Sequence, residues 1–139
     1  MRSGGVFPTV TLETLTADSA WTPSDAEDDA IDTVASARNT LTIRVWGGDW
    51  CGDCQSVLPP FAAALETAGI DPTSVIQYPV TKRDDGTKDG PAVDEYDIHS
   101  IPTIVFERDG KELARFVESS DRPAIVDLAD QLLARPDTP

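Results

Sequence analysis

Apolar residues along the chain follow two kinds of spacing, one typical of strands and one typical of helices. Short apolar or alternating runs rich in β-branched and aromatic residues predict strands, which cover 41–46, 75–80, 103–106 and 112–117. Apolar positions spaced by three and four residues predict helices, which cover 25–38, 51–68 and 122–133, with a shorter one at 91–96. Residues 7–15 alternate weakly and are expected to form a short edge strand.

Turn signals and prolines refine this pattern. Asp109 and Gly110 separate the last two strands, and Asp-Gly between β-rich runs predicts an antiparallel hairpin. Pro59 and Pro60 fall inside the second predicted helix, where a missing amide donor predicts a kink. The polar residues 82–90 are expected to form a loop. Because the earlier strands alternate with helices, they should pair in parallel, so the chain is predicted to be an α/β protein. Its central mixed β-sheet should be flanked by helices on both faces, in a single domain over residues 1–139.

The charge balance excludes several classes of partner. The chain has 25 acidic and 11 basic residues, a net charge of −14. Such a charge repels phosphate backbones and anionic lipid surfaces, so we expect neither nucleic-acid nor membrane binding. The beginning of the chain has no apolar stretch typical of a signal peptide, which favours a cytoplasmic location.

The acidic composition has two interpretations. It can serve only as a solvated surface that keeps the protein in solution. It is also typical of a halophilic host, where dense carboxylates hold water and salt screens their repulsion. The scarcity of lysine favours the halophilic interpretation, because the chain contains only Lys82, Lys88 and Lys111.

The two cysteines of the chain, Cys51 and Cys54, form a C-x-x-C motif where a strand gives way to a helix. A helix N-terminus offers amide donors and the positive end of a dipole to a sulfur anion, so Cys51 should ionise below the pKa of an ordinary thiol. Cys54, one turn further along, can then resolve a mixed disulfide. Gly52 is expected to permit the tight turn, and Trp50 to shield one side of the site.

The cysteines and several nearby residues have alternative interpretations. A zinc site needs four ligands, and the chain has a single histidine, His99, so no metal is expected. A purely structural disulfide is unusual in a cytosolic protein. Asp53 is either a first-turn acid favoured by the helix dipole or a group that moves protons for the cysteines. His99 is either a solvated loop residue or part of a docking groove. The large aromatic residues expected in the core are Trp21, Trp46 and Phe61.

The segment Trp50-Cys51-Gly52-Asp53-Cys54 resembles the active-site motif W-C-G-P-C of the thioredoxin family, with aspartate in place of proline. Residues 96–103 resemble the segment that ends in the cis-proline of that family, and 106–112 resemble the hairpin after it. Pro59 falls where the family has a helix-kinking proline. The resemblance spans residues 41–133 and leaves 1–24 as an N-terminal extension with an edge strand.

The resemblance implies a thioredoxin-like fold and a cis bond between Ile101 and Pro102. The backbone of Ile101 would then lie beside Cys51, where a bound peptide can pair with it as an added strand. The implied activity is that of a thiol–disulfide oxidoreductase, most simply a protein disulfide reductase with no bound cofactor. Its partners would be disulfide-containing substrate proteins and a thioredoxin-reductase-type electron donor, and the protein would be a monomer.

The sequence also departs from the family. The buried aspartate that precedes the family motif is replaced by Arg44 or Val45, depending on where one gap is placed, and the buried lysine of the next strand has no clear counterpart. The residues found in that strand are Gln77, Tyr78 and Val80. Proton transfer would then use water or another carboxylate, with Asp53 the nearest, or turnover would be slower. A non-catalytic redox sensor or interaction module, and a disulfide oxidase or isomerase, remain as alternatives.

Overall fold

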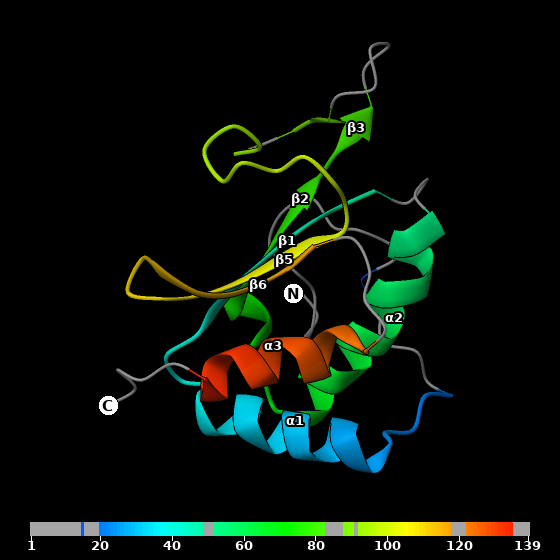
Figure 1. Cartoon of the computed structure of the whole chain (residues 1–139), viewed down its shortest axis with the longest axis vertical. Helices are drawn as coiled ribbons and strands as arrows, with labels where there is room; N and C mark the ends of the chain where they lie inside the picture. The colour runs from blue at the N-terminus through cyan, green and yellow to red at the C-terminus, as the bar shows by residue number, and fades with distance from the viewer. Residues whose placement is uncertain are drawn as a thin grey trace, which may run out of the picture.

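Four strands form the central sheet, in the order β2–β1–β5–β6. A computed structural model describes residues 15, 20–48, 52–82, 88–90, 92–117 and 122–134 (Figure 1). The strands are β1 (Thr42–Gly47), β2 (Val75–Pro79), β5 (Thr103–Arg108) and β6 (Lys111–Val117). β1 pairs with β2 in parallel and with β5 antiparallel, and β5 pairs antiparallel with β6. The predicted mixed sheet is therefore confirmed.

Three helices accompany the sheet: α1 (Asp25–Ser36), α2 (Gly52–Thr67) and α3 (Ala124–Leu133). Figure 1 shows α1 and α3 side by side below the sheet, and both contact α2. α1 begins in a capping box, in which Ser24 and Glu27 satisfy each other's backbone amides. α2 continues through Pro59 and Pro60 without a break. Within the described residues, no helix is both long and apolar enough to cross a membrane.

Alternate residues of β1 point to opposite faces of the sheet, and one set of them faces the helices and forms the core there. Ile43 and Val45 are fully buried, and Ile43 pairs with Phe106 of β5. Phe106 in turn contacts Phe61 of α2, with ring centroids 6.4 Å apart. Trp46 is also fully buried and points to the opposite face of the sheet. The expectation of a core position is confirmed for Trp46 and Phe61, whereas Trp21 is only partly buried and packs against the core.

The hairpin between β5 and β6 turns at Asp109 and Gly110, as predicted. Their φ angles are 53° and 79°. Both values lie in the left-handed region, which a two-residue turn between right-twisted strands requires and which Asp-Gly supplies readily. The backbone conformations that Asp109 and Gly110 readily adopt therefore favour the observed pairing of β5 with β6.

The segment 91–96 was predicted to be a short helix, and this prediction is wrong. Residues 92–97 form successive turns, in which Ala92 and Asp97 have φ angles of 60° and 58°. A left-handed residue at each end cannot continue a right-handed helix. Figure 1 shows this part of the chain above the sheet, on the side away from α1 and α3, so turns cover that face where a helix was expected.

Two further differences are small. The predicted loop 82–90 includes a two-stranded ladder, in which β3 (Thr81–Lys82) pairs with β4 (Lys88–Asp89). A single 3-10 turn, η1 (Pro72–Ser74), precedes β2. The predicted edge strand at 7–15 lies outside the described residues except for Leu15, which is buried in the core.

Candidate active site

Cys54 is buried in the first turn of α2, with none of its surface exposed. The backbone amide of Gly48, just beyond the end of β1, donates a hydrogen bond to the Sγ atom of Cys54 over 3.5 Å. A hydrogen bond to sulfur stabilises the thiolate more than the thiol. Two further members of the predicted site, Trp50 and Cys51, lie outside the described residues.

The two residues between the cysteines are both exposed. Gly52 and Asp53 open α2, and Asp53 is the acidic residue of its first turn. A Cβ atom added to Gly52 would meet nothing within 4 Å, and its φ angle is not in the left-handed region. The local geometry at residue 52 therefore does not itself require a glycine, and the turn that Gly52 was expected to permit involves residues outside those described.

The peptide bond between Ile101 and Pro102 is cis, as the resemblance implied. Both residues are buried. Thr103, the next residue, pairs with Trp46 near the end of β1. The sheet register therefore places the Ile101–Pro102 bond at the edge from which the chain leaves β1 toward the two cysteines.

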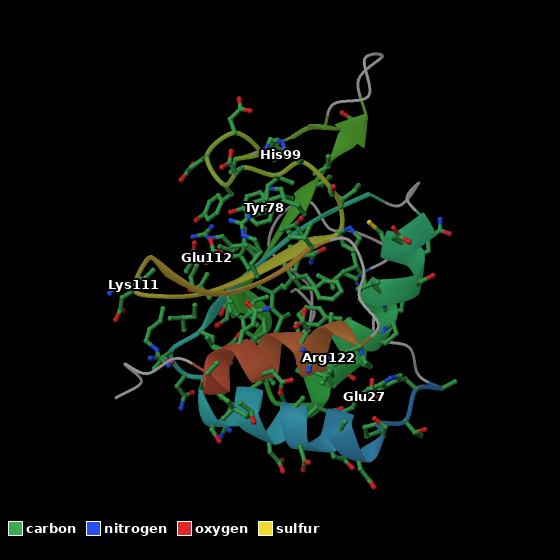
Figure 2. All side chains as sticks on the ribbon, in the orientation of Figure 1. Glu27, Tyr78, His99, Lys111, Glu112 and Arg122 are labelled. Carbon is green, nitrogen blue, oxygen red and sulfur yellow. The ribbon has the colours of Figure 1, made fainter. Side chains whose placement is uncertain are left out.

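His99 belongs to the segment that leads into this cis bond. Its side chain is 83% exposed, and its Nε2 atom lies 3.7 Å from Oδ1 of the equally exposed Asp97. Figure 2 shows His99 on the side of the sheet away from α1 and α3. Its exposure agrees with the interpretation of His99 as a solvated loop residue.

A cluster of polar and aromatic side chains packs on the same face of the sheet. Arg44 of β1 donates from Nε to Oε1 of Glu107 over 2.7 Å and from Nη1 to the hydroxyl of Tyr78. The hydroxyl of Tyr96 donates to Oε2 of Glu107, also over 2.7 Å. The indole of Trp46 lies beneath them, stacked on Tyr78 with centroids 4.5 Å apart. We call these five residues the Arg44 cluster; Figure 2 labels Tyr78 among them.

The electrostatics of the Arg44 cluster follow from this arrangement. Burial opposes the charge of Arg44, but hydrogen bonds to Glu107 and Tyr78 outweigh burial and raise the pKa of its guanidinium. Burial, together with the hydrogen bond that its hydroxyl donates to Glu107, raises the pKa of Tyr96 to about 12. The positive guanidinium also lies 5.4 Å from the centre of the Tyr96 ring, within range of a cation–π interaction.

A second arginine ties the turn segment to the hairpin. Arg115 of β6 donates to the backbone carbonyl of Tyr96 over 3.0 Å and makes a two-pronged pair with Glu112. Gln131 of α3 bonds both the amide and the carbonyl of Arg115 from the other side of the strand. The turns that precede the Ile101–Pro102 bond are thus held to the sheet by side chains of three strands.

Sequence reasoning did not identify the Arg44 cluster as a unit. The available signal was an arginine inside an apolar strand and a glutamate at the end of another, since an isolated buried charge requires a partner. Their pairing depends on the register between β1 and β5, which the sequence alone does not reveal.

Comparison with known families gives the decisive observation. The family model described as Thioredoxin matches residues 25–131, most of the chain. This chain belongs to the thioredoxin family. Thioredoxins are thiol–disulfide oxidoreductases, so the predicted class of activity and the predicted fold class are confirmed.

Individual thioredoxins show the extent of the similarity. The chain is 32% identical over 84 residues to thioredoxin of Chlamydia caviae, covering 60% of this chain and 74% of that one. It is 28% identical over 103 residues to thioredoxin of Chlamydia trachomatis, covering 74% and 90%. Among solved structures, Fasciola hepatica thioredoxin aligns with 76% of this chain and 90% of its own, at 21% identity and a TM-score of 0.49.

One thioredoxin feature is changed behind the motif. Val45 points to the same face of the sheet as Ile43, toward the core beneath the helices, whereas Arg44 points to the opposite face. Of the two residues considered for the position of the family's buried aspartate, Val45 is the one that is buried on the core side of the sheet. Its partner across the parallel ladder is Gln77, which is 5% exposed. Both members of this buried pair are neutral.

Proposed function

We propose that this thioredoxin is a protein disulfide reductase in which Cys51 attacks the substrate and Cys54 resolves the mixed disulfide. The observation that carries the proposal is the burial of Cys54 in the first turn of α2, with the amide of Gly48 donating to its sulfur. A thiol so placed is hidden from an incoming protein disulfide but is only three positions along the chain from Cys51. These are the properties of a resolving cysteine.

The proposed reaction balances as a two-electron exchange. The thiolate of Cys51 attacks one substrate sulfur, the substrate disulfide breaks, and the departing sulfur takes a proton from solvent. Cys54, once deprotonated, attacks the sulfur of Cys51, and the second substrate thiol leaves. The protein ends as the Cys51–Cys54 disulfide, and the substrate gains two electrons and two protons. Because Val45 and Gln77 carry no carboxylate, water or another carboxylate, such as that of Asp53, would accept the proton of Cys54.

The docking surface of the proposal is the segment around the cis bond. A disulfide-containing segment of a substrate would pair with the backbone of Ile101 as an added strand, beside Pro102, with Trp50 shielding one side. The Arg44 cluster and Arg115 support this surface, because they hold the turns that precede Ile101 to the sheet.

The remaining features of the proposal concern the setting of the protein. Electrons would come from a thioredoxin-reductase-type donor, without a bound cofactor. The protein would act as a monomer in the cytoplasm of a halophilic cell, in agreement with its net charge of −14. Residues 1–139 would form one domain, with 1–24 as an extension before the part that matches the family.

Reduction of insulin by the protein in the presence of dithiothreitol tests the proposal. We expect turnover by the unchanged protein, none by Cys51→Ser, and a trapped mixed disulfide with substrate in Cys54→Ser. Absence of turnover in the unchanged protein would favour the redox-sensor alternative. Trapping through Cys54 in the Cys51→Ser variant would reverse the two roles.

The redox potential separates a reductase from an oxidase or isomerase. The negative charge of Asp53 opposes formation of the Cys51 thiolate. The thiolate, and with it the reduced form of the protein, is therefore stabilised less than it would be by the helix dipole alone. We expect a potential nearer to about −270 mV than to about −180 mV when the protein is equilibrated with glutathione. A potential above roughly −200 mV would support the oxidase or isomerase alternative. Asp53→Pro removes the charge and restores the family motif, so it should isolate this effect.

A further inference from the structure

Asp53 is an exposed negative charge inside the redox motif. It lies in the first turn of α2, next to the buried Cys54. Within the described part of the chain, Asp53 has no ion-pair partner, and α2 contains neither lysine nor arginine. The described arginines that form ion pairs do so with other carboxylates: Arg44 pairs with Glu107, Arg115 with Glu112, and Arg122 with Asp127 and Asp130.

The start of α2 therefore presents a net negative charge to an approaching molecule. The helix dipole places the equivalent of about half a positive charge at this end. The full negative charge of Asp53 exceeds it, and both lie in the same turn. The remainder of the protein does not reverse the sign, because its net charge is −14. The usual preference of a helix N-terminus for anions is thus overcome.

We propose that Asp53 is a specificity-determining residue that makes this thioredoxin prefer disulfides flanked by lysine or arginine. The inference rests on the proposed function, because a substrate must bring its disulfide to Cys51 and Cys54. Groups that flank that disulfide then come within a few ångströms of Asp53. A unit charge at contact distance in water changes an encounter rate by about three- to fivefold, upward for a cation and downward for an anion.

Three small disulfides that differ in charge test the inference: cystamine is cationic, hydroxyethyl disulfide is neutral and dithiodipropionate is anionic. The rate of oxidation of the reduced protein is measured with each, by the change in tryptophan fluorescence. The rate of each protein with a charged disulfide is divided by its own rate with the neutral one. This ratio removes any change in the acidity of the cysteines, and comparison between proteins removes the difference in leaving groups.

The variants are Asp53→Asn and, as a matched control, Asp28→Asn. Asp28 is also an exposed aspartate in the first turn of a helix, but in α1, so both variants change the net charge equally. We expect Asp53→Asn to lower the cystamine ratio and raise the dithiodipropionate ratio, each by about three- to fivefold at low salt. The differences should shrink in molar KCl, because salt screens them. Asp28→Asn should leave both ratios unchanged.

The outcomes separate this inference from the proposed function. Equal ratios in the unchanged protein and in Asp53→Asn would overturn the inference, and so would equal shifts in the two variants, which would assign the preference to net charge alone. If the unchanged protein failed to react even with the neutral disulfide, the proposed function itself would fail.

Discussion

The hydroxyl of Tyr96 donates a hydrogen bond to Oε2 of Glu107 over 2.7 Å, which joins the turns before the cis bond to strand β5. The side chain of Glu107 is only 5% exposed, and its other oxygen accepts from Arg44. One buried carboxylate therefore accepts hydrogen bonds from two elements that are distant in sequence. Its removal should affect both the stability of the sheet and the segment that leads to Ile101.

Replacement of Glu107 by glutamine should lower the free energy of unfolding by about 1–3 kcal/mol, measured in urea. Arg44 and Tyr96 both donate to the carboxylate, whereas an amide can accept on its oxygen only and presents its NH₂ group to the other donor. The matched control is Glu112→Gln, because Glu112 pairs with Arg115 but is 40% exposed. Its loss should stay within about 1 kcal/mol, as for surface pairs. Equal losses in the two variants would contradict the role assigned to Glu107.

Tyr96 should make the stability fall at high pH. Burial, and then its hydrogen bond to Glu107, raises its pKa in the folded protein to about 12, above the ordinary value of 10.0. The stabilisation is complete below pH 10 and is lost as the pH rises through the folded pKa, since the unfolded chain releases the proton first. Near-ultraviolet titration should show one tyrosine ionising with this raised midpoint. Tyr96→Phe should lack that late step; a late step that persists in this variant would contradict its assignment to Tyr96.

Cys54 should react with iodoacetamide far more slowly than Cys51 at neutral pH. Its side chain has no exposed surface, so the reagent reaches it only after local opening of α2. Single-cysteine variants make the comparison direct, because Cys51→Ser leaves only Cys54 and Cys54→Ser leaves only Cys51. Mass spectrometry of timed samples gives both rates. Faster labelling of the protein that retains Cys54 would disprove the assigned roles.

Potassium chloride should raise the melting temperature. The net charge of −14 destabilises the folded state through self-repulsion, which salt screens. Relief of about 1 kcal/mol would raise the melting temperature by roughly 3–5 °C in a chain of this size. A double variant, Asp29→Asn with Asp32→Asn, removes two exposed charges of α1 and should show a smaller rise. A melting temperature that stays constant or falls with salt would remove the support for a halophilic host.

Local patterns were sufficient for most elements of the fold. The apolar alternation over 41–46 predicted β1, and Asp109 and Gly110 predicted the hairpin, because each rests on preferences of neighbouring residues. The segment 91–96 was expected to be helical, yet its described residues, 92–96, form turns. Its conformation is set by bonds to distant residues, such as that between Tyr96 and Glu107, which sequence periodicity does not contain.

The site shows the same division between local and distant information. The C-x-x-C spacing and the segment before Pro102 could be read from the chain, and the cis bond followed from the resemblance. The choice between Arg44 and Val45 for the buried position could not be read, because it depends on which face of β1 meets the helices. The pairing of Val45 with Gln77 likewise depends on the register of a parallel ladder.

The hydrogen bonds that both carboxylate oxygens of Glu107 accept limit how this chain can diverge over evolutionary time. A change at position 107 leaves Arg44 and Tyr96 without their shared hydrogen-bond acceptor. A change at 44 or 96 leaves one oxygen of the buried carboxylate without that hydrogen bond. Single changes at these positions should therefore be eliminated by selection, and joint changes retained. In an alignment of descendants, positions 44, 96 and 107 should vary together, although 63 residues separate the first from the last in the chain.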